Sequence, residues 1–134
     1  LDTLEWAESV GGLEGLIARA DENAGVLGEW VERTPWIDFL AAAPQTRSNT
    51  SVCLAIVDPA VMALGEDARR AFVKRLAALL EEEGAAYDIS GHRDAPPGLR
   101  IWTGATVEKA DLAALTPWLD WAFETAKSEI ARAA

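Results

Sequence analysis

The chain has 134 residues, of which half are hydrophobic and a quarter are charged, a composition typical of one folded domain. Its 22 acidic residues against 12 basic ones give a formal net charge of −10. This charge argues against binding to nucleic acid or to an anionic membrane surface, because both need a basic face. No apolar run approaches the roughly 20 residues that span a bilayer, so we expect a soluble, cytoplasmic protein.

The first third of the chain predicts a long helix with a break. Asp2-Thr3-Leu4-Glu5 is typical of a helix start, with a capping side chain and a carboxylate behind it. Gly11-Gly12 interrupts the pattern, apolar residues then recur at helical spacing from Leu13, and Thr34-Pro35 ends the run. We expect residues 1–12 to belong to a connection with another part of a longer protein.

Two strands and an amphipathic helix are predicted next. Trp36–Leu40 is short and apolar, and Ser51–Val57 has a strand-like composition, so the two are expected to pair as neighbours. Asp58-Pro59 combines a capping residue with a proline suited to the first helical position. The helix proper is expected over Asp67–Glu83, where Gly84 stops it.

The last third predicts two more strands and a helix. Ala86–Ile89 and Leu99–Thr103 are the strand candidates. Asp111 or Thr116 is expected to cap the last helix, in which Pro117 is either a first-turn residue or a kink. The predicted fold class is α+β, a small open sheet of about four strands with three helices packed on it.

The single cysteine, Cys53, lies inside an apolar strand candidate, which favours a small core residue over a nucleophile. Glu81-Glu82-Glu83 is interpreted as a solvated surface run rather than a metal site. The chain lacks a phosphate-cradling glycine loop, a Gly-x-Ser-x-Gly elbow, a zinc pattern and a CxxC pair. We therefore predict no catalytic residue and no metal ligand in this chain.

Residues 90–100 concentrate the candidate binding chemistry. They hold the only histidine, His92, together with Arg93 and Arg100, beside two prolines and two glycines that turn the backbone. A guanidinium grips a carboxylate or phosphate in two places, so the segment predicts a pocket for an anionic small molecule. The alternative is a solvated turn in which Arg100 pairs with a neighbouring carboxylate. Trp102 either walls the pocket or packs on the sheet.

A family resemblance rests on four motifs. Gly91-His92-Arg93 followed by Gly98-Leu99-Arg100, with Trp6–Leu13 near the start and Arg47-Ser48-Asn49 between them, resembles the C-terminal part of the phosphoserine aminotransferases. These belong to the class V aminotransferases. The resemblance implies a homodimeric enzyme of fold type I that uses pyridoxal 5'-phosphate. It also implies amino transfer from glutamate to 3-phosphohydroxypyruvate in serine biosynthesis, with phosphoserine and 2-oxoglutarate as products.

The resemblance also implies roles for the candidate residues. Arg100 would hold the substrate α-carboxylate, and His92 and Arg93 would hold the substrate phosphate or the distal carboxylate of glutamate. The cofactor-binding lysine, the acid at the pyridine nitrogen and the phosphate cradle would belong to a large domain outside this chain. Lys74, Lys109 and Lys127 are not expected to form the Schiff base, because all three lie on or near exposed helix faces.

The resulting hypothesis is that residues 1–134 are one domain, the C-terminal small domain of such an enzyme, inactive and without cofactor as an isolated fragment. A chain that begins at Leu1 rather than at methionine fits this expectation. Two alternatives remain open. One is the small domain of another class V aminotransferase, whose substrate lacks a phosphate. The other is a free-standing regulatory domain that binds an amino acid and self-associates.

Overall fold

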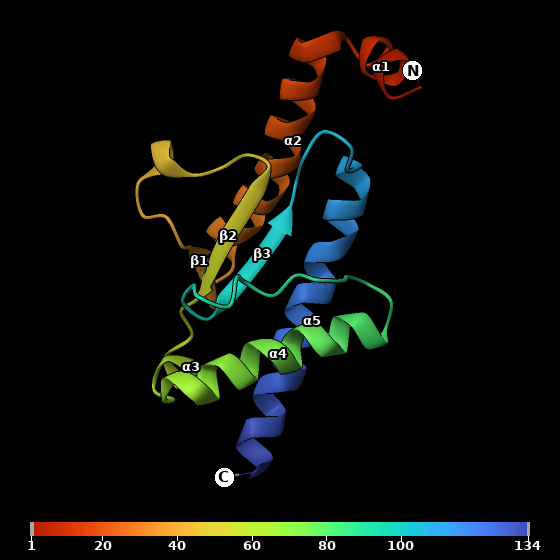
Figure 1. The fold of residues 1–134 in the computed structure, drawn as a ribbon. Coiled ribbons are helices and arrows are strands. Elements are labelled where there is room, and N and C mark those ends of the chain that lie inside the picture. The colour runs from red at the N-terminus through yellow and green to blue at the C-terminus, as the bar shows by residue number, and fades with distance from the viewer. Residues whose placement is uncertain (1, 134) are drawn as a thin grey trace.

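A three-stranded antiparallel sheet in the order β1-β2-β3 lies against helices in the computed structural model, which describes residues 2–133 (Figure 1). Its elements in chain order are α1 (Asp2–Ser9), α2 (Gly12–Arg33), β1 (Ile37–Phe39), β2 (Ser51–Ile56), α3 (Pro59–Met62), α4 (Glu66–Glu82), β3 (Gly98–Trp102) and α5 (Lys109–Ala133), with a 3-10 turn at Pro44–Thr46. The α+β class is confirmed. None of the helices formed by these residues is long and apolar enough to cross a membrane.

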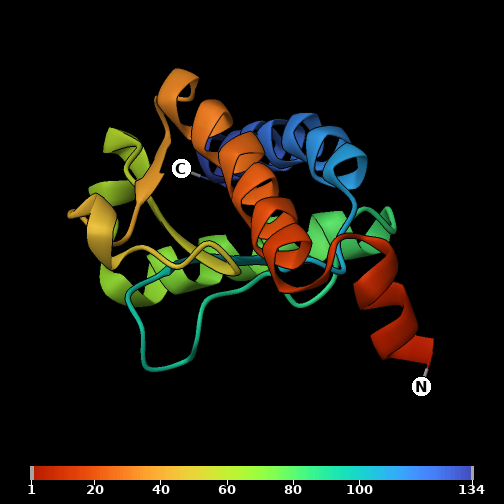
Figure 2. The same cartoon turned by 90° about the horizontal axis from the view of Figure 1, so that it is seen from above.

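The predicted break near the N-terminus is confirmed. Gly11 and Gly12 have φ angles of 102° and 65°, in the left-handed region that a side chain disfavours. They separate α1 from α2, and α2 ends at Arg33, directly before the predicted stop. No residue of α1 is buried, and α1 projects away from the body of the molecule (Figure 2). Leu1 lies outside the described residues.

The core lies between the sheet and the helices α2, α4 and α5. The ring of Trp36 stacks on Phe123 of α5 with centroids 4.2 Å apart and meets the edge of Trp30 of α2 at 5.5 Å. Both indole N–H groups donate to the carboxylate of Asp120, at 3.0 Å from Trp36 and 3.2 Å from Trp30. Asp120 thereby joins α5, α2 and the residue that precedes β1.

The predicted cap at Asp58 is confirmed. Its carboxylate accepts from the backbone N–H groups of Ala60 and Val61 at 3.0 and 3.2 Å and from Lys127 Nζ of α5 at 2.7 Å. Burial by itself would raise the pKa of Asp58. The hydrogen bonds from Lys127, Val61 and Ala60 outweigh that effect, so the pKa lies below its ordinary value. Asp58 therefore fixes the start of α3 to the far end of α5.

The prediction of a strand at Ala86–Ile89, the third of four in chain order, is wrong, and the described residues form three strands. Asp88 has a φ of 52°, which interrupts the extended backbone that a strand needs. The segment still follows the edge of β3, because Ser90 forms an isolated bridge with Leu99 and the Arg100 N–H donates to Ile89 O at 2.8 Å. The described residues form five helices instead of the three expected. The glycine break separates α1 from α2, and the Asp58 cap begins the short helix α3 before α4.

The last helix starts earlier than predicted. It begins at Lys109, so Asp111 and Thr116 lie inside α5 and neither is its cap, and Pro117 is an interior residue. Proline lacks the N–H that would bond the carbonyl four residues before it. The Thr116 hydroxyl donates to that carbonyl, Ala113 O, at 3.1 Å. This substitute hydrogen bond explains how the helix continues through Pro117.

Candidate anion-binding site

The face of the sheet that no helix covers carries one of the predicted site residues. Along β2 and β3 the side chains alternate, so Val52, Leu54, Leu99 and Ile101 fill the core and their neighbours point outward. Cys53 is paired directly with Arg100, and Ser51 with Trp102. Cys53 is exposed, so its prediction as a core residue is wrong. An apolar run does not tell which of its alternate positions faces the core.

Arg100 is available to a ligand. Its guanidinium Nη2 lies 3.9 Å from Asp88 Oδ2, and the two side chains are 40% and 91% exposed. A pair this long and this solvated contributes little, so Asp88 does not occupy the guanidinium. The main chain of Arg100 is held firmly, because its N–H donates to Ile89 O at 2.8 Å. The fork of donors therefore projects from a rigid strand.

A pocket of about 380 Å³ surrounds Arg100. Its lining residues are Ser51, Tyr87, Asp88, Ile89, Arg100 and Trp102. Trp102 is 58% exposed, and its ring rests on Gly104, where an added Cβ would come within 2.5 Å of the indole. Of the two interpretations of Trp102, the pocket wall is the one that the geometry supports.

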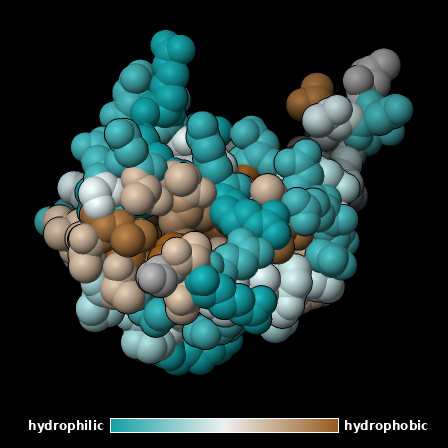
Figure 3. Space-filling model, turned by 90° about the horizontal axis from the view of Figure 1, so that it is seen from below, coloured by the Kyte–Doolittle hydropathy of each residue, from teal (hydrophilic) through white to brown (hydrophobic). Residues whose placement is uncertain are grey.

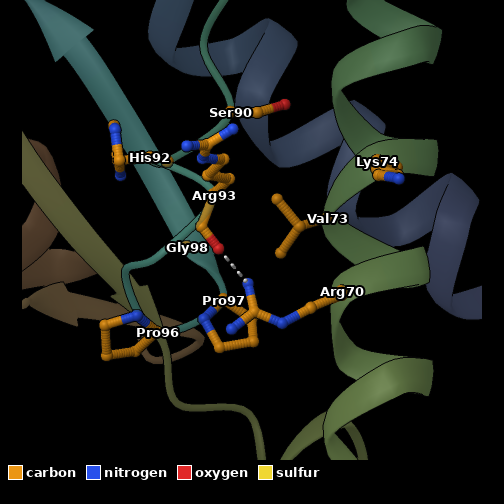
Figure 4. Close-up of a pocket in the computed structure, with 10 residues that line it drawn as sticks. Arg70, Val73, Lys74, Ser90, His92, Arg93, Pro96, Pro97 and Gly98 are labelled. Carbon is orange, nitrogen blue, oxygen red and sulfur yellow. Dashed lines mark hydrogen bonds between the residues drawn. The ribbon is translucent and has the colours of Figure 1, made fainter.

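His92 and Arg93 lie at a different pocket, of about 280 Å³, between the loop and α4 (Figure 4). Its lining residues are Arg70, Val73, Lys74, Ser90, Gly91, His92, Arg93, Pro96, Pro97 and Gly98. The structure thus brings His92 and Arg93 together and places Arg100 at the neighbouring pocket. The loop closes on itself, since the Gly91 N–H donates to Gly98 O at 2.9 Å.

The histidine has one nitrogen free to donate. Its Nδ1 accepts from the backbone N–H of Asp94 at 3.2 Å. The proton of the neutral imidazole therefore sits on Nε2, and the side chain is exposed. Arg93 is more exposed still, and its Nε lies 3.6 Å from a carboxylate oxygen of the exposed Asp94. Both side chains can turn toward an anion.

The close approach of β2 and β3 explains why a glycine, Gly98, precedes Leu99 and Arg100. A Cβ at Gly98 would lie 2.1 Å from Leu54 O of β2, so a side chain at this position would push the two strands apart. Leu99 then points into the core and Arg100 points outward. The Gly-Leu-Arg motif is the sequence of a strand that crosses close to its neighbour while presenting a guanidinium on the open face.

Two basic residues of the second pocket were missed by the sequence analysis. Arg70 and Lys74 come from α4, one helical turn apart. Arg70 Nη1 donates to Arg93 O at 3.2 Å, and its other nitrogens donate to Glu66 at 2.8 and 3.2 Å. The spacing of Arg70 and Lys74 by one helical turn, next to the apolar Val73, could have indicated in the sequence that they share a helix face. Only the packing of α4 beside residues 90–98 shows that they meet the loop.

The lysines of this chain do not fit a pyridoxal phosphate site. Lys127 Nζ is 2.7 Å from Asp58, Lys109 Nζ is 3.7 Å from Glu22, and Lys74 lies on the exposed side of α4. A Schiff-base lysine needs a free amine in a desolvated pocket, and none of the three meets that condition. Within residues 2–133 there is also no group of three or more His, Cys, Asp or Glu side chains placed to hold a metal ion.

Comparison with known proteins finds sequences similar to this chain within longer proteins. No family model matches the chain. Over 127 residues, or 95% of its length, it is 47% identical to the protein named phosphoserine aminotransferase of Methanosarcina mazei. The chain is homologous to part of phosphoserine aminotransferase. It spans 32% of the length of that relative. A phosphoserine aminotransferase of a Nocardioides species is 30% identical over 120 residues.

Solved phosphoserine aminotransferases share the fold. The enzyme from Bacillus circulans subsp. alkalophilus superposes with a TM-score of 0.71 at 19% identity, covering 90% of this chain and 30% of that one. At this identity the match concerns the fold alone. The expected α+β fold is confirmed, and the sequence similarity confirms the resemblance inferred from the four motifs.

Proposed function

We propose that this chain is the C-terminal small domain of a phosphoserine aminotransferase, in which glutamate and 3-phosphohydroxypyruvate give phosphoserine and 2-oxoglutarate. The observation that carries the proposal is the 47% identity across 95% of the chain. Residues 1–134 would form a single domain, with residues 1–12 as the connection to the rest of the enzyme. The absence of any buried residue in α1 supports this division.

Arg100 binds the substrate α-carboxylate in this proposal. Its weakly paired guanidinium on a rigid strand supports bidentate binding of a planar anion. His92 and Arg93 bind the phosphate or the distal carboxylate of glutamate, and their exposed donors support that role. Holding both ends of the substrate fixes its orientation for amino transfer. The chain itself supplies binding and orientation, and no catalytic group.

The cofactor follows from the family. Pyridoxal 5'-phosphate acts as the electron sink of such enzymes, and it would be held outside this chain, since the lysines here do not fit it. The complete enzyme would be a cytoplasmic homodimer. The isolated chain would bind no cofactor and would be inactive.

The Arg100→Ala variant of the full-length enzyme tests this function. Loss of two charge-assisted hydrogen bonds should cost about 3 kcal/mol of transition-state binding, roughly a hundredfold in kcat/KM for phosphoserine. Arg33→Ala, an exposed arginine at the end of α2, is the matched control and should change nothing. An unchanged kcat/KM in Arg100→Ala would refute the assignment.

A substrate panel tests the specificity. The full-length enzyme should use phosphoserine far better than serine or alanine, and Arg93→Gln should reduce its activity on phosphoserine alone. Equal activity on the three amino acids would instead identify a class V aminotransferase whose substrate carries no phosphate.

A further inference from the structure

The pocket around Arg100 carries little net charge, although it contains a guanidinium. Asp88, whose Oδ2 lies 3.9 Å from Arg100 Nη2, offsets the positive charge, and the other residues that line the pocket are uncharged. An ion pair that stays in water strengthens binding by about fivefold at most. Charge alone therefore does not make this pocket a strong site for a carboxylate, and exclusion of water from the guanidinium has to contribute.

The indole of Trp102 is an apolar wall beside that guanidinium. Arg100 and Trp102 are two residues apart on β3, so their side chains lie on the same face of the sheet. Both line the pocket, and Trp102 is largely exposed. An anion that reaches Arg100 in this pocket therefore meets the ring on one side, and an ion pair beside an apolar surface is stronger than one surrounded by water.

The main chain against which Trp102 rests is held in place. The ring lies so close to Gly104 that an added Cβ would come within 2.5 Å of it. The Gly104 carbonyl accepts from the buried amide of Asn23 at 3.2 Å, and the Thr103 N–H donates to Thr50 O at 2.8 Å. The ring thus has a fixed support, and a ligand does not have to order the backbone beneath it.

A second apolar surface shows what distinguishes the pocket of Arg100. Apolar side chains gather on the α4 side of the molecule (Figure 3), where a groove between α4 and α5 is lined mainly by apolar residues. The guanidinium in that groove, Arg75, donates to both carboxylate oxygens of Glu129 and to Glu82. It is occupied, whereas Arg100 combines an apolar wall with a guanidinium whose partner is distant and solvated.

We propose that Trp102 is a specificity-determining residue, whose indole packs against the carboxylate held by Arg100 and against the carbon atom that bears it. This inference rests on the proposed function. The ring shields the ion pair from water, and it favours an organic carboxylate over a hydrated inorganic anion that brings no apolar surface. An α-carboxylate on carbon is common to both amino-acid substrates, so Trp102 acts on both alike.

Titration of the chain with acetate and with formate, at constant ionic strength, tests the wall directly. Acetate has one methyl group more, and its burial against the ring should make the wild type bind acetate about fourfold more tightly than formate. The indole N–H resonance of Trp102 should shift on binding. Trp102→Ala should lose the preference, and Trp118→Ala, which removes an exposed tryptophan of α5, should keep it. Equal binding of the two anions by the wild type, or a preference that survives in Trp102→Ala, would overturn the proposal.

Kinetics of the full-length enzyme separate this inference from the proposed function. Trp102→Ala should raise the KM for phosphoserine and the KM for glutamate by the same factor, about tenfold, with kcat unchanged, and Trp102→Phe should restore most of the loss. If the wild type uses phosphoserine and Trp102→Ala changes neither KM, or only one of them, the role of Trp102 is wrong and the function stands. If the wild type does not use phosphoserine, the proposed function fails, and the acetate titration still decides the role of Trp102.

Discussion

Trp36 and Trp102 lie on opposite sides of the same sheet. Trp36 is 6% exposed, stacked on Phe123 and hydrogen-bonded to Asp120, whereas Trp102 is 58% exposed and walls the pocket of Arg100. Burial in the core accounts fully for a tryptophan at position 36. It does not explain Trp102, because a large apolar ring left in water on an ordered strand adds little to folding. The helix-covered side of the sheet stabilises the fold, and the open side carries the exposed side chains that we propose for binding.

The largest expected effect is on the covered side. Trp36→Ala removes a stacked ring and a hydrogen bond to Asp120, and should lower the free energy of unfolding by about 3–5 kcal/mol. Urea denaturation measures it. Trp102→Ala is the matched control on the open side and should cost less than about 1 kcal/mol. Equal losses in the two variants would break the comparison between the two sides.

A buried polar residue should give the next largest effect. Asn23 of α2 is 2% exposed, and its amide donates to the carbonyls of Thr103, Gly104 and Val107, the closest at 2.8 Å. Asn23→Ala leaves these carbonyls without their partner and should cost about 2–3 kcal/mol in urea denaturation. Asn49→Ala, which loses one exposed hydrogen bond to Asp21, should be nearly neutral. A neutral Asn23→Ala would show that α2 does not hold the end of β3.

The cap at Asp58 should matter less and should depend on pH. Asp58→Ala should cost about 1 kcal/mol at pH 7, while Asp58→Asn keeps a capping oxygen and loses only the ionic bond to Lys127. Since the folded pKa of Asp58 is lowered from 3.8, its ionic contribution is present above pH 3.8 and is lost as the pH falls below it. The stability gap between wild type and Asp58→Asn should therefore shrink from pH 7 to pH 3. A gap that grows would contradict the pairing.

The smallest effect concerns the open side. Cys53 lies directly opposite Arg100 and is the only cysteine. A guanidinium on the residue paired directly with the thiol attracts an anionic reagent by less than about 1 kcal/mol in water, so Arg100→Gln should lower the ratio of iodoacetate to iodoacetamide alkylation rates about twofold at low salt. The ratio cancels any change in thiolate fraction. An unchanged ratio would mean that the guanidinium points away from this face.

Much of the secondary structure was predictable from local patterns. The glycine break before α2, the Asp58 cap and the amphipathic run of α4 follow from backbone and capping preferences within a few residues. The conformation of Ala86–Ile89 was not predictable in this way, because a single left-handed residue, Asp88, ends the extended conformation. Pro117 was ambiguous, because its tolerance depends on one hydroxyl of Thr116. Such decisions rest on individual atoms rather than on composition.

The sequence by itself determined the α+β class, the family resemblance and the identity of His92, Arg93 and Arg100 as candidate anion ligands, since residue types and their order carry that information. Only the tertiary structure decided that Arg100 and the His92–Arg93 pair line neighbouring pockets, that Cys53 faces outward, and that Lys74 joins the loop. The physical reason is that strand alternation and helix packing assign each side chain to a face. Residues far apart in the chain meet only where those faces meet.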